Sequence, residues 1–142
     1  MTEATATPEP ARADPARIGA QLARIGRIGA DPDGGVSRLA FTWPEREAHE
    51  LVGGWLRDLG LEVRVDAVGN TTATRPGTTD GRPAIGIGSH LDSVYHGGRY
   101  DGIVGVVGAV ELARLLVEDG TALVHPVRVV VFAGEEGARF GE

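Results

Sequence analysis

The sequence predicts an α/β fold with a parallel sheet, and three observations carry that prediction. Residues 84–89 and 127–132 are short apolar segments, and the second is an almost continuous run of Val, as in buried strands. Residues 103–117 lie between them and have the length and apolar content of a buried helix. Strand, helix and strand in this order form a βαβ unit, whose two strands lie parallel in one sheet.

The composition alone favours some classes of protein and argues against others. The chain has 142 residues, 42% of them hydrophobic, which fits one globular domain with its own core. The net charge of −6 argues against a nucleic-acid partner. There is no cysteine, so His, Asp and Glu are the strong metal ligands that remain. We find no signal peptide or membrane-spanning run, and we expect a cytoplasmic protein with no membrane partner.

A first helix is predicted from its start signals. Residues 1–13 are rich in Ala, Thr, Pro and Glu and are expected to form a disordered tail. Asp14 is a candidate N-cap, and Pro15 suits the first turn of a helix. One helical face then carries the apolar residues Ile18, Leu22, Ile25 and Ile28.

A second helix is predicted to begin after Thr42 and to end at Gly60. Thr42 and Glu45 match a capping box, in which each side chain accepts a hydrogen bond from the other residue's backbone N–H. Trp43 is expected in the core or in a hydrophobic staple beside this cap. His49 lies within the helix and is expected at the surface.

The sequence also predicts a β-hairpin and the burial of the strands and helix of the βαβ unit. Residues 61–68 alternate apolar and polar side chains, and residues 71–75 can pair back on them across a Gly-Asn turn. The Val run at 127–132 is expected to be covered on both faces. The helix at 103–117 is apolar all round in its first half, and a solvated face is expected at Glu111, Arg114 and Glu118.

Three Gly-rich polar clusters lie at the ends of the βαβ elements. They read GSHLD at 88–92, GGRYDG at 97–102 and GEEG at 134–137. The first and third follow the carboxyl ends of the two strands, and the second immediately precedes the helix. Parallel sheets bind ligands outside the carboxyl ends of their strands. We therefore expect one edge of the sheet to gather His90, Asp101, Glu135 and Glu136.

These residue types suit a site for divalent metal ions. Imidazole and carboxylate groups bind such ions, so the candidate ligands are His90, Asp101 and Glu136. Asp92 could hold the second ring nitrogen of His90 and fix its tautomer. Glu135 would be free to act as catalytic base toward the attacking water. Taken alone, each residue also suits a polar strand end, an Asp-Gly turn or a solvated Glu pair; their convergence favours the metal site.

The motifs resemble those of a known enzyme family. The segments GSHLDSVYHGGRYDGIVGVVGAVE and VVVFAGEEGARF are similar to the M20 metallohydrolase superfamily, and the GGRYDG and EEGARF forms favour its amidase, hydantoinase and carbamoylase branch. That branch includes N-carbamoyl-L-amino acid hydrolases and allantoate amidohydrolases. The resemblance implies a three-layer α/β/α, zinc-peptidase-like catalytic domain with a mostly parallel mixed sheet, incomplete at its C-terminus.

The resemblance also implies a role for each site residue. His90 and Glu136 match metal ligands, Asp101 the acid that bridges two ions, Glu135 the general base and Asp92 the acid that supports the histidine. Family members use two divalent ions, Zn, Mn, Co or Ni. Their reaction is hydrolysis of a C–N bond in a linear amide or ureido compound, so the expected partner is a small-molecule substrate.

Members of the family continue well beyond the position that matches Glu142. We therefore expect residues 14–142 to be the N-terminal part of a metal-binding catalytic domain. The remainder would hold a further metal-binding His, a distal His ligand and a lid domain that forms a homodimer in the full-length parent. No histidine of this chain replaces those ligands convincingly; the candidates weighed are His49, His96 and His125. The isolated chain is accordingly expected to be inactive.

Two alternatives remain open at this point. The first is an M20 peptidase or aminoacylase, which would use the same residues on a different substrate. The second is a non-catalytic remnant that acts at most as an interaction module. Metal binding that depends on Asp101 would support either enzyme hypothesis, and its absence would support the non-catalytic remnant.

Overall fold

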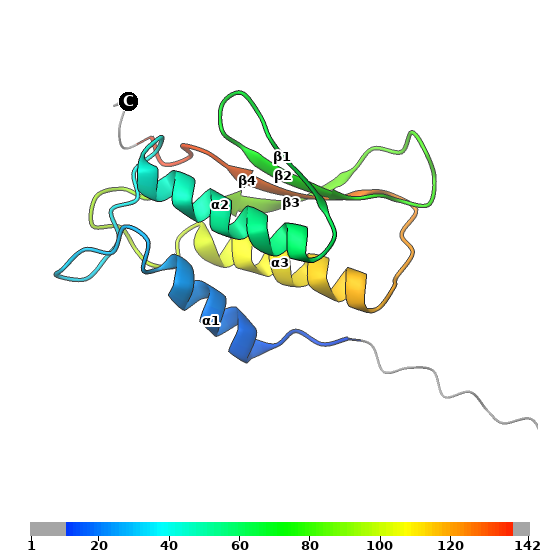
Figure 1. Ribbon diagram of the computed structural model, residues 1–142, viewed down its shortest axis with the longest axis horizontal. Helices are drawn as coiled ribbons and strands as arrows, with labels where there is room; N and C mark the ends of the chain where they lie inside the picture. Colours follow the sequence, from blue (N-terminus) through cyan, green and yellow to red (C-terminus); the bar gives the residue numbers. More distant parts are fainter. Residues whose placement is uncertain (1–10, 138–142) are drawn as a thin grey trace, which may run out of the picture.

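The structure, a computed structural model, describes residues 11–137. It contains three helices and one four-stranded sheet within that range (Figure 1). In chain order the elements are α1 (Pro15–Ile25), α2 (Trp43–Asp58), β1 (Glu62–Val65), β2 (Thr71–Arg75), β3 (Ile85–His90), α3 (Ile103–Glu118) and β4 (Val127–Phe132). Every predicted element is present, with ends displaced by a few residues.

The sheet is mixed, and its strand order is β1-β2-β4-β3. β3 and β4 pair in parallel around α3, which confirms the predicted βαβ unit and the α/β class. β1 and β2 form the predicted antiparallel hairpin, and β2 also pairs antiparallel with β4. Two of the three pairings are therefore antiparallel, so the described sheet is less parallel than expected. The reason is that the hairpin joins β4 directly.

All three helices lie on one face of the sheet (Figure 1). α3 packs against β3 and β4, α2 packs against the hairpin strands, and α1 packs on α3. Burial in β4 alternates, with Val127, Val129 and Val131 buried but Arg128 and Phe132 exposed. Within residues 11–137 the helices thus form a layer on one side only, and the expected coverage of both faces is not seen there.

The helical layer and the inner face of the sheet enclose one apolar core. Its members come from all three helices and from β2 and β4, and they include Ile25, Leu56, Val106, Val110 and Val131. Burial of such side chains contributes about 1.5–3 kcal/mol each to folding. Within residues 11–137, no helix combines the length and apolar character that crossing a bilayer requires.

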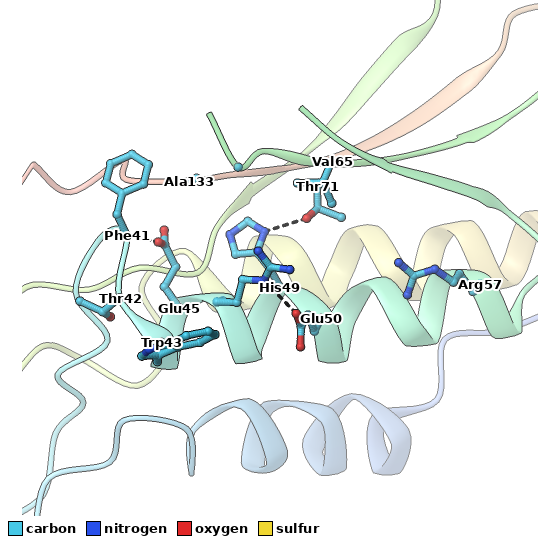
Figure 2. A pocket seen from close by; sticks show the side chains of 12 residues that line it. Phe41, Thr42, Trp43, Glu45, His49, Glu50, Arg57, Val65, Thr71 and Ala133 are labelled. Atoms are coloured by element: carbon cyan, nitrogen blue, oxygen red, sulfur yellow. Dashed lines mark hydrogen bonds and ion pairs between the residues drawn. The ribbon is translucent and has the colours of Figure 1, made fainter. Parts of the chain in front are cut away.

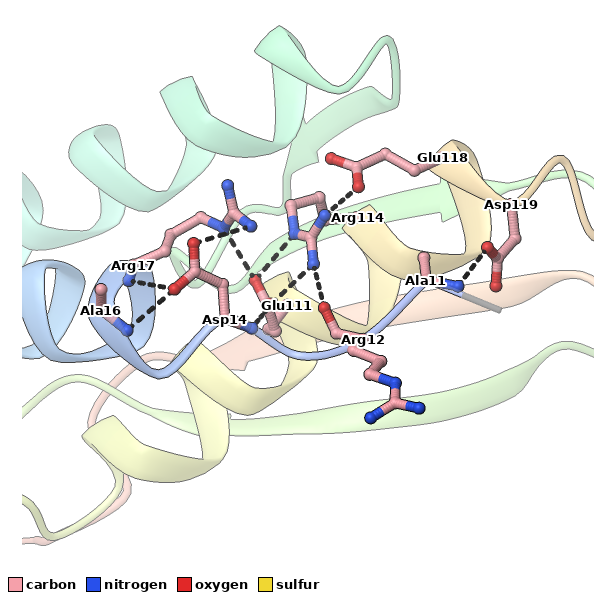
Figure 3. Close-up of polar contacts among 9 residues, drawn as sticks. All are labelled: Ala11, Arg12, Asp14, Ala16, Arg17, Glu111, Arg114, Glu118 and Asp119. Carbon is pink, nitrogen blue, oxygen red and sulfur yellow. Dashed lines mark hydrogen bonds and ion pairs between the residues drawn. The ribbon is translucent and has the colours of Figure 1, made fainter. Parts of the chain in front are cut away.

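The segment before α1 is bound to α3 by polar contacts (Figure 3). The Asp14 side chain caps α1, as predicted, by accepting from the N–H groups of Ala16 and Arg17. Glu111 of α3 accepts from the Asp14 N–H at 2.8 Å and from Arg114. The predicted solvated face of α3 holds at Glu118, whose side chain is 49% exposed, but is wrong at Glu111 and Arg114, which are only 3% and 6% exposed. These two are covered because the chain before α1 crosses them.

The predicted tail at residues 1–13 falls mostly outside the described residues. Of the part that is described, the Ala11 N–H donates to the Asp119 side chain and the Arg12 carbonyl accepts from Arg114. Together with the contacts of Asp14 they form a polar anchor between the segment before α1 and helix α3, which reaches back to Ala11.

The predicted capping box of α2 is wrong in detail. The Thr42 side chain makes no cap hydrogen bond; its hydroxyl donates to the Leu39 carbonyl instead. Glu45 reaches past Thr42 and accepts from the Phe41 N–H at 2.5 Å. Trp43 is 84% exposed, not in the core. The chain enters α2 through Phe41, which has a positive φ of 57°, and this turn directs Trp43 outward.

Candidate metal site

The three predicted ligands lie together at the carboxyl edge of the sheet. His90 ends β3, Asp101 lies two residues before α3, and Glu136 follows β4. One donor atom from each lies within 4.8 Å of the other two. The parallel register places His90 opposite Phe132, so the two strands end at the same level. The structure thus brings these residues together as the order of elements predicts.

A glycine lets α3 begin close to His90. Gly102 has a φ of +69°, a conformation that side chains other than glycine's rarely adopt. A Cβ atom at this position would lie 2.6 Å from both Cε1 and the backbone oxygen of His90. The close approach brings Asp101, the preceding residue, to the imidazole.

The two ring nitrogens of His90 face different groups. Nδ1 lies 3.1 Å from the Asp92 carbonyl oxygen, to which it can donate a hydrogen bond, and 3.4 Å from Asp92 Oδ1. Nε2 lies 3.6 Å from Oε2 of Glu135. A proton held on Nδ1 leaves the Nε2 lone pair free for a metal ion. Asp92 therefore lies where a group that orients His90 should be.

Asp92 also binds the loop after β4, a role that the sequence did not predict. It is 1% exposed, and its two oxygens accept from the backbone N–H groups of Glu135 at 3.1 Å and Glu136 at 2.9 Å. One buried carboxylate thus holds the backbone of both candidate glutamates and lies beside the candidate histidine ligand. No spacing rule connects residues this far apart in the chain.

Two further residues hold the same loop, and sequence reasoning missed both. Asn70, in the turn between β1 and β2, accepts from the Ala133 N–H at 2.9 Å. Glu45 of α2 accepts from the Gly134 N–H at 3.0 Å. The signal for Glu45 was present but was interpreted as a local helix cap, and Asn70 was interpreted only as a turn residue.

The electrostatics of the group suit a bound cation. Burial raises the pKa of Glu136; His90 opposes that shift, while Asp101, Glu135 and Asp92 add to it. Several carboxylates thus surround one imidazole, and a divalent ion would offset their repulsion. An imidazole and carboxylates within 4.8 Å of one another are a donor set that Zn²⁺ or Mn²⁺ accepts. The residues present therefore fit a divalent metal ion.

The other histidines lie elsewhere in the fold. His49 is buried, contrary to expectation, and its Nδ1 lies 2.9 Å from Thr71 Oγ1. His96 lies on a loop, 3.1 Å from Asp31 Oδ2. His125 lies before β4, at the amino end of that strand, with its Nδ1 2.9 Å from the Pro83 carbonyl oxygen. None of the three belongs to the ligand group found among the described residues.

A groove of about 680 Å³ lies beside the loop that follows β4, between α2 and the β1–β2 hairpin. Figure 2 shows Phe41, Glu45 and His49 along it, with the Glu45 carboxylate directed toward Phe41 and Ala133. Glu45 and His49 thus form a polar floor near the end of β4. Exposed side chains of α2 add to the lining, namely Trp43, Arg46, Glu50 and Arg57.

Comparison with known proteins identifies the family of this chain. The sequence profile of peptidase family M28 matches residues 70–141, a span that includes every candidate site residue. The chain belongs to peptidase family M28.

The predicted carbamoylase branch is confirmed by the relatives of this M28-family chain. It is 45% identical over 124 residues to an N-carbamoyl-L-amino acid amidohydrolase of Geobacillus stearothermophilus, covering 87% of this chain and 30% of that protein. It is 35% identical over 121 residues to a ureidoglycolate hydrolase of Oryza sativa, covering 85% and 25%.

A solved structure gives the same result for the fold. A hydantoinase/carbamoylase family amidase from Burkholderia ambifaria matches with a TM-score of 0.87 and 45% identity, over 91% of this chain and 32% of that one. The M28-family chain thus spans about a third or less of the relatives that it matches.

Proposed function

We propose that this chain supplies metal ligands and the catalytic base of a metal-dependent amidohydrolase acting on C–N bonds of linear amide or ureido compounds. The observation that carries the proposal is the meeting of His90, Asp101 and Glu136 within 4.8 Å, in a chain 45% identical to an N-carbamoyl-L-amino acid amidohydrolase. The proposed substrates are N-carbamoyl-L-amino acids or allantoate-like ureido compounds.

In the proposed site His90 binds metal through Nε2, and Asp101 and Glu136 bind through carboxylate oxygens. The family resemblance supports two ions, of Zn, Mn, Co or Ni, which these residues would help to hold. When bound, such ions polarise the carbonyl of the substrate and make water a better nucleophile near neutral pH.

Glu135 is the proposed base. Its side chain is 55% exposed, so water and substrate can reach it, and Oε2 lies 3.6 Å from His90 Nε2. It accepts a proton from the attacking water and returns it to the leaving nitrogen as the C–N bond breaks. Asp92 contributes by holding the backbone of Glu135 and the ring of His90, not by reacting itself.

Calorimetric titration of Mn²⁺ and Zn²⁺ into the 142-residue chain tests the proposal. We expect binding that is lost in Asp101→Asn and retained in Asp58→Asn, an exposed acid at the end of α2. Absence of binding in the unmodified chain, or unchanged binding in Asp101→Asn, would favour a non-catalytic remnant. We also propose that the isolated chain binds metal without turnover, because three side chains leave two ions short of ligands.

Substrate class is tested by hydrolysis assays with metal added. Release of ammonia or amine from N-carbamoyl amino acids, N-acyl amino acids and dipeptides would be compared in a longer protein that contains this sequence and in this chain. Preference for the first substrate supports the carbamoylase reading, and preference for the others supports a peptidase or aminoacylase. A homodimer is proposed for the full-length protein, and a cytoplasmic location is proposed for both.

A further inference from the structure

The loop after β4 is held by side chains from three other parts of the fold. Four consecutive backbone N–H groups donate to such side chains, from Ala133 to Asn70, from Gly134 to Glu45, and from Glu135 and Glu136 to Asp92. Loop amides away from a sheet need partners of this kind when they are partly buried. The directions of the Glu135 and Glu136 side chains therefore depend on acceptors brought by tertiary structure.

Glu45 has the geometry of a rigid acceptor. It is 4% exposed and lies in the first turn of α2. Oε1 accepts from Gly134 at 3.0 Å and Oε2 accepts from Phe41 at 2.5 Å, so each oxygen has a backbone partner. Figure 2 shows the carboxylate between α2 and the Phe41 and Ala133 backbones. The two hydrogen bonds leave the side chain little freedom to move.

The backbone at Gly134 needs such a partner. Gly134 has a φ of +69°, and a Cβ atom there would lie 2.8 Å from Cε2 of the Phe41 ring. The turn thus brings Gly134 against Phe41, and Glu45 binds the backbone of both residues. Displacing this turn would displace the next two residues, which are the candidate base and a candidate ligand.

A buried arginine balances the charge of the acceptors. Arg38 is 1% exposed, and its guanidinium donates to the carbonyls of Leu91, Ile25 and Ile28. Burial lowers its pKa to about 10, and attraction to Asp92 and Glu45 opposes the shift, so it stays cationic at neutral pH. Burial raises the pKa of Glu45, while the hydrogen bonds from Phe41 and Gly134 oppose that rise.

We propose that Glu45 is a positioning residue for the Glu135–Glu136 loop, acting through the Gly134 N–H without touching metal or substrate. The inference rests on the proposed function, because it assumes that Glu135 is the base and that Glu136 is a metal ligand. An ordinary helix-capping role would end at the start of α2. The hydrogen bond to Gly134, 89 residues away in sequence, goes beyond it.

Glu45→Gln in the 142-residue chain is the test. Glutamine keeps the size but offers one acceptor oxygen, so one of the two N–H groups loses its partner. The matched control is Glu50→Gln, on the next turn of α2, where the side chain is 65% exposed and pairs with Arg46. The readouts are amide hydrogen exchange across the chain and the affinity for Mn²⁺ by calorimetry.

We expect Glu45→Gln to speed exchange about tenfold at residues 134–136 and to weaken Mn²⁺ binding roughly tenfold. Exchange in α1 and α3 should stay unchanged, as should both readouts in Glu50→Gln. Faster exchange throughout the chain, unchanged exchange at 134–136, or a local change with unaltered Mn²⁺ affinity would each overturn the proposal.

Two further measurements keep the test decisive. If Glu45→Gln does not fold, a through-hydrogen-bond NMR coupling between the Gly134 nitrogen and the Glu45 carboxyl carbon is measured in the unmodified chain. Its presence supports the proposal and its absence overturns it. If the unmodified chain binds no Mn²⁺, the proposed function fails, while local exchange still decides whether Glu45 positions the loop.

Discussion

Asp92 Oδ2 accepts a hydrogen bond from the backbone N–H of Glu136 at 2.9 Å, with both residues at the carboxyl edge of the sheet. The other oxygen of the same carboxylate accepts from Glu135. The candidate base and a candidate ligand are therefore held by one side chain from the loop after β3. The same residue lies against Nδ1 of His90, so the β3 and β4 sides of the site are joined through it.

Replacing Asp92 with Asn should weaken metal binding. The Asn side chain has one acceptor oxygen, so one backbone N–H at 135 or 136 loses its partner and the loop is less well placed. We expect Mn²⁺ affinity to fall about 10- to 100-fold and the free energy of unfolding to fall by about 1–3 kcal/mol. Calorimetry and urea unfolding measure the two effects. The same results in Asp58→Asn would contradict this explanation.

Replacing Gly102 with Ala should destabilise the fold and move His90. The added Cβ meets the imidazole and backbone of His90 at 2.6 Å, and the positive φ is strained for any side chain. We expect a loss of about 2 kcal/mol or more in the free energy of unfolding. Gly108→Ala is the control on the same helix, since a Cβ there meets nothing within 4 Å. It should stabilise α3 by up to about 1 kcal/mol, and equal losses in both variants would refute the steric argument.

His49 should make the protein less stable in mild acid. Burial lowers its pKa from 6.5 to about 4. Between these values the unfolded chain binds a proton that the folded chain does not, so stability falls as pH drops from 6.5 toward 4, by up to about 3 kcal/mol.

Urea unfolding at several pH values measures the effect of His49. His49→Gln cannot titrate, so its stability should depend less on pH in this window than that of the unmodified chain. Parallel curves for His49→Gln and the unmodified chain would show that His49 does not titrate as its burial predicts.

Glu111 should be the critical residue of the polar anchor between α1 and α3 (Figure 3). The hydrogen bonds from Arg114 lower the pKa of Glu111 to about 2, with the Asp14 N–H and Arg17 acting in the same direction. Its contribution to stability is present above pH 4.5 and is lost as pH falls from there toward 2.

Glu111→Gln leaves Arg114 without its buried partner. We expect a loss of about 3–5 kcal/mol in the free energy of unfolding at neutral pH and faster amide exchange in α1. Glu118→Gln removes the half-exposed partner of the same arginine and should cost less than about 1 kcal/mol. Similar costs for the two variants would mean that burial of Glu111 does not set its importance.

Local sequence patterns were sufficient for the elements and for the candidate ligands. β4 has the predicted bounds, and β3 and α3 differ by about a residue at their ends, because apolar periodicity and turn residues act over a few neighbours. The sequence also predicted that the ligands lie close together, because a βαβ unit places the ends of its two strands at one edge of the sheet. These ligands are His90, Asp101 and Glu136.

Long-range burial could not be predicted in the same way. Glu111, Arg114 and His49 have helical spacing and charge that suit a surface, yet each is buried by a segment distant in sequence. Glu45 was interpreted as a cap because Thr42 precedes it at the right spacing. Its contact with Gly134 spans 89 residues and has no local pattern.

The sequence by itself determined which residues could bind a metal, because the side-chain chemistry and the order of strand and helix suffice for that. Only the tertiary structure decided what holds those residues in place. Asp92, Glu45 and Asn70 hold the loop after β4 through its backbone N–H groups. A backbone N–H is the same in nearly every residue, so the residue type at the donating position does not reveal such a hydrogen bond in the sequence.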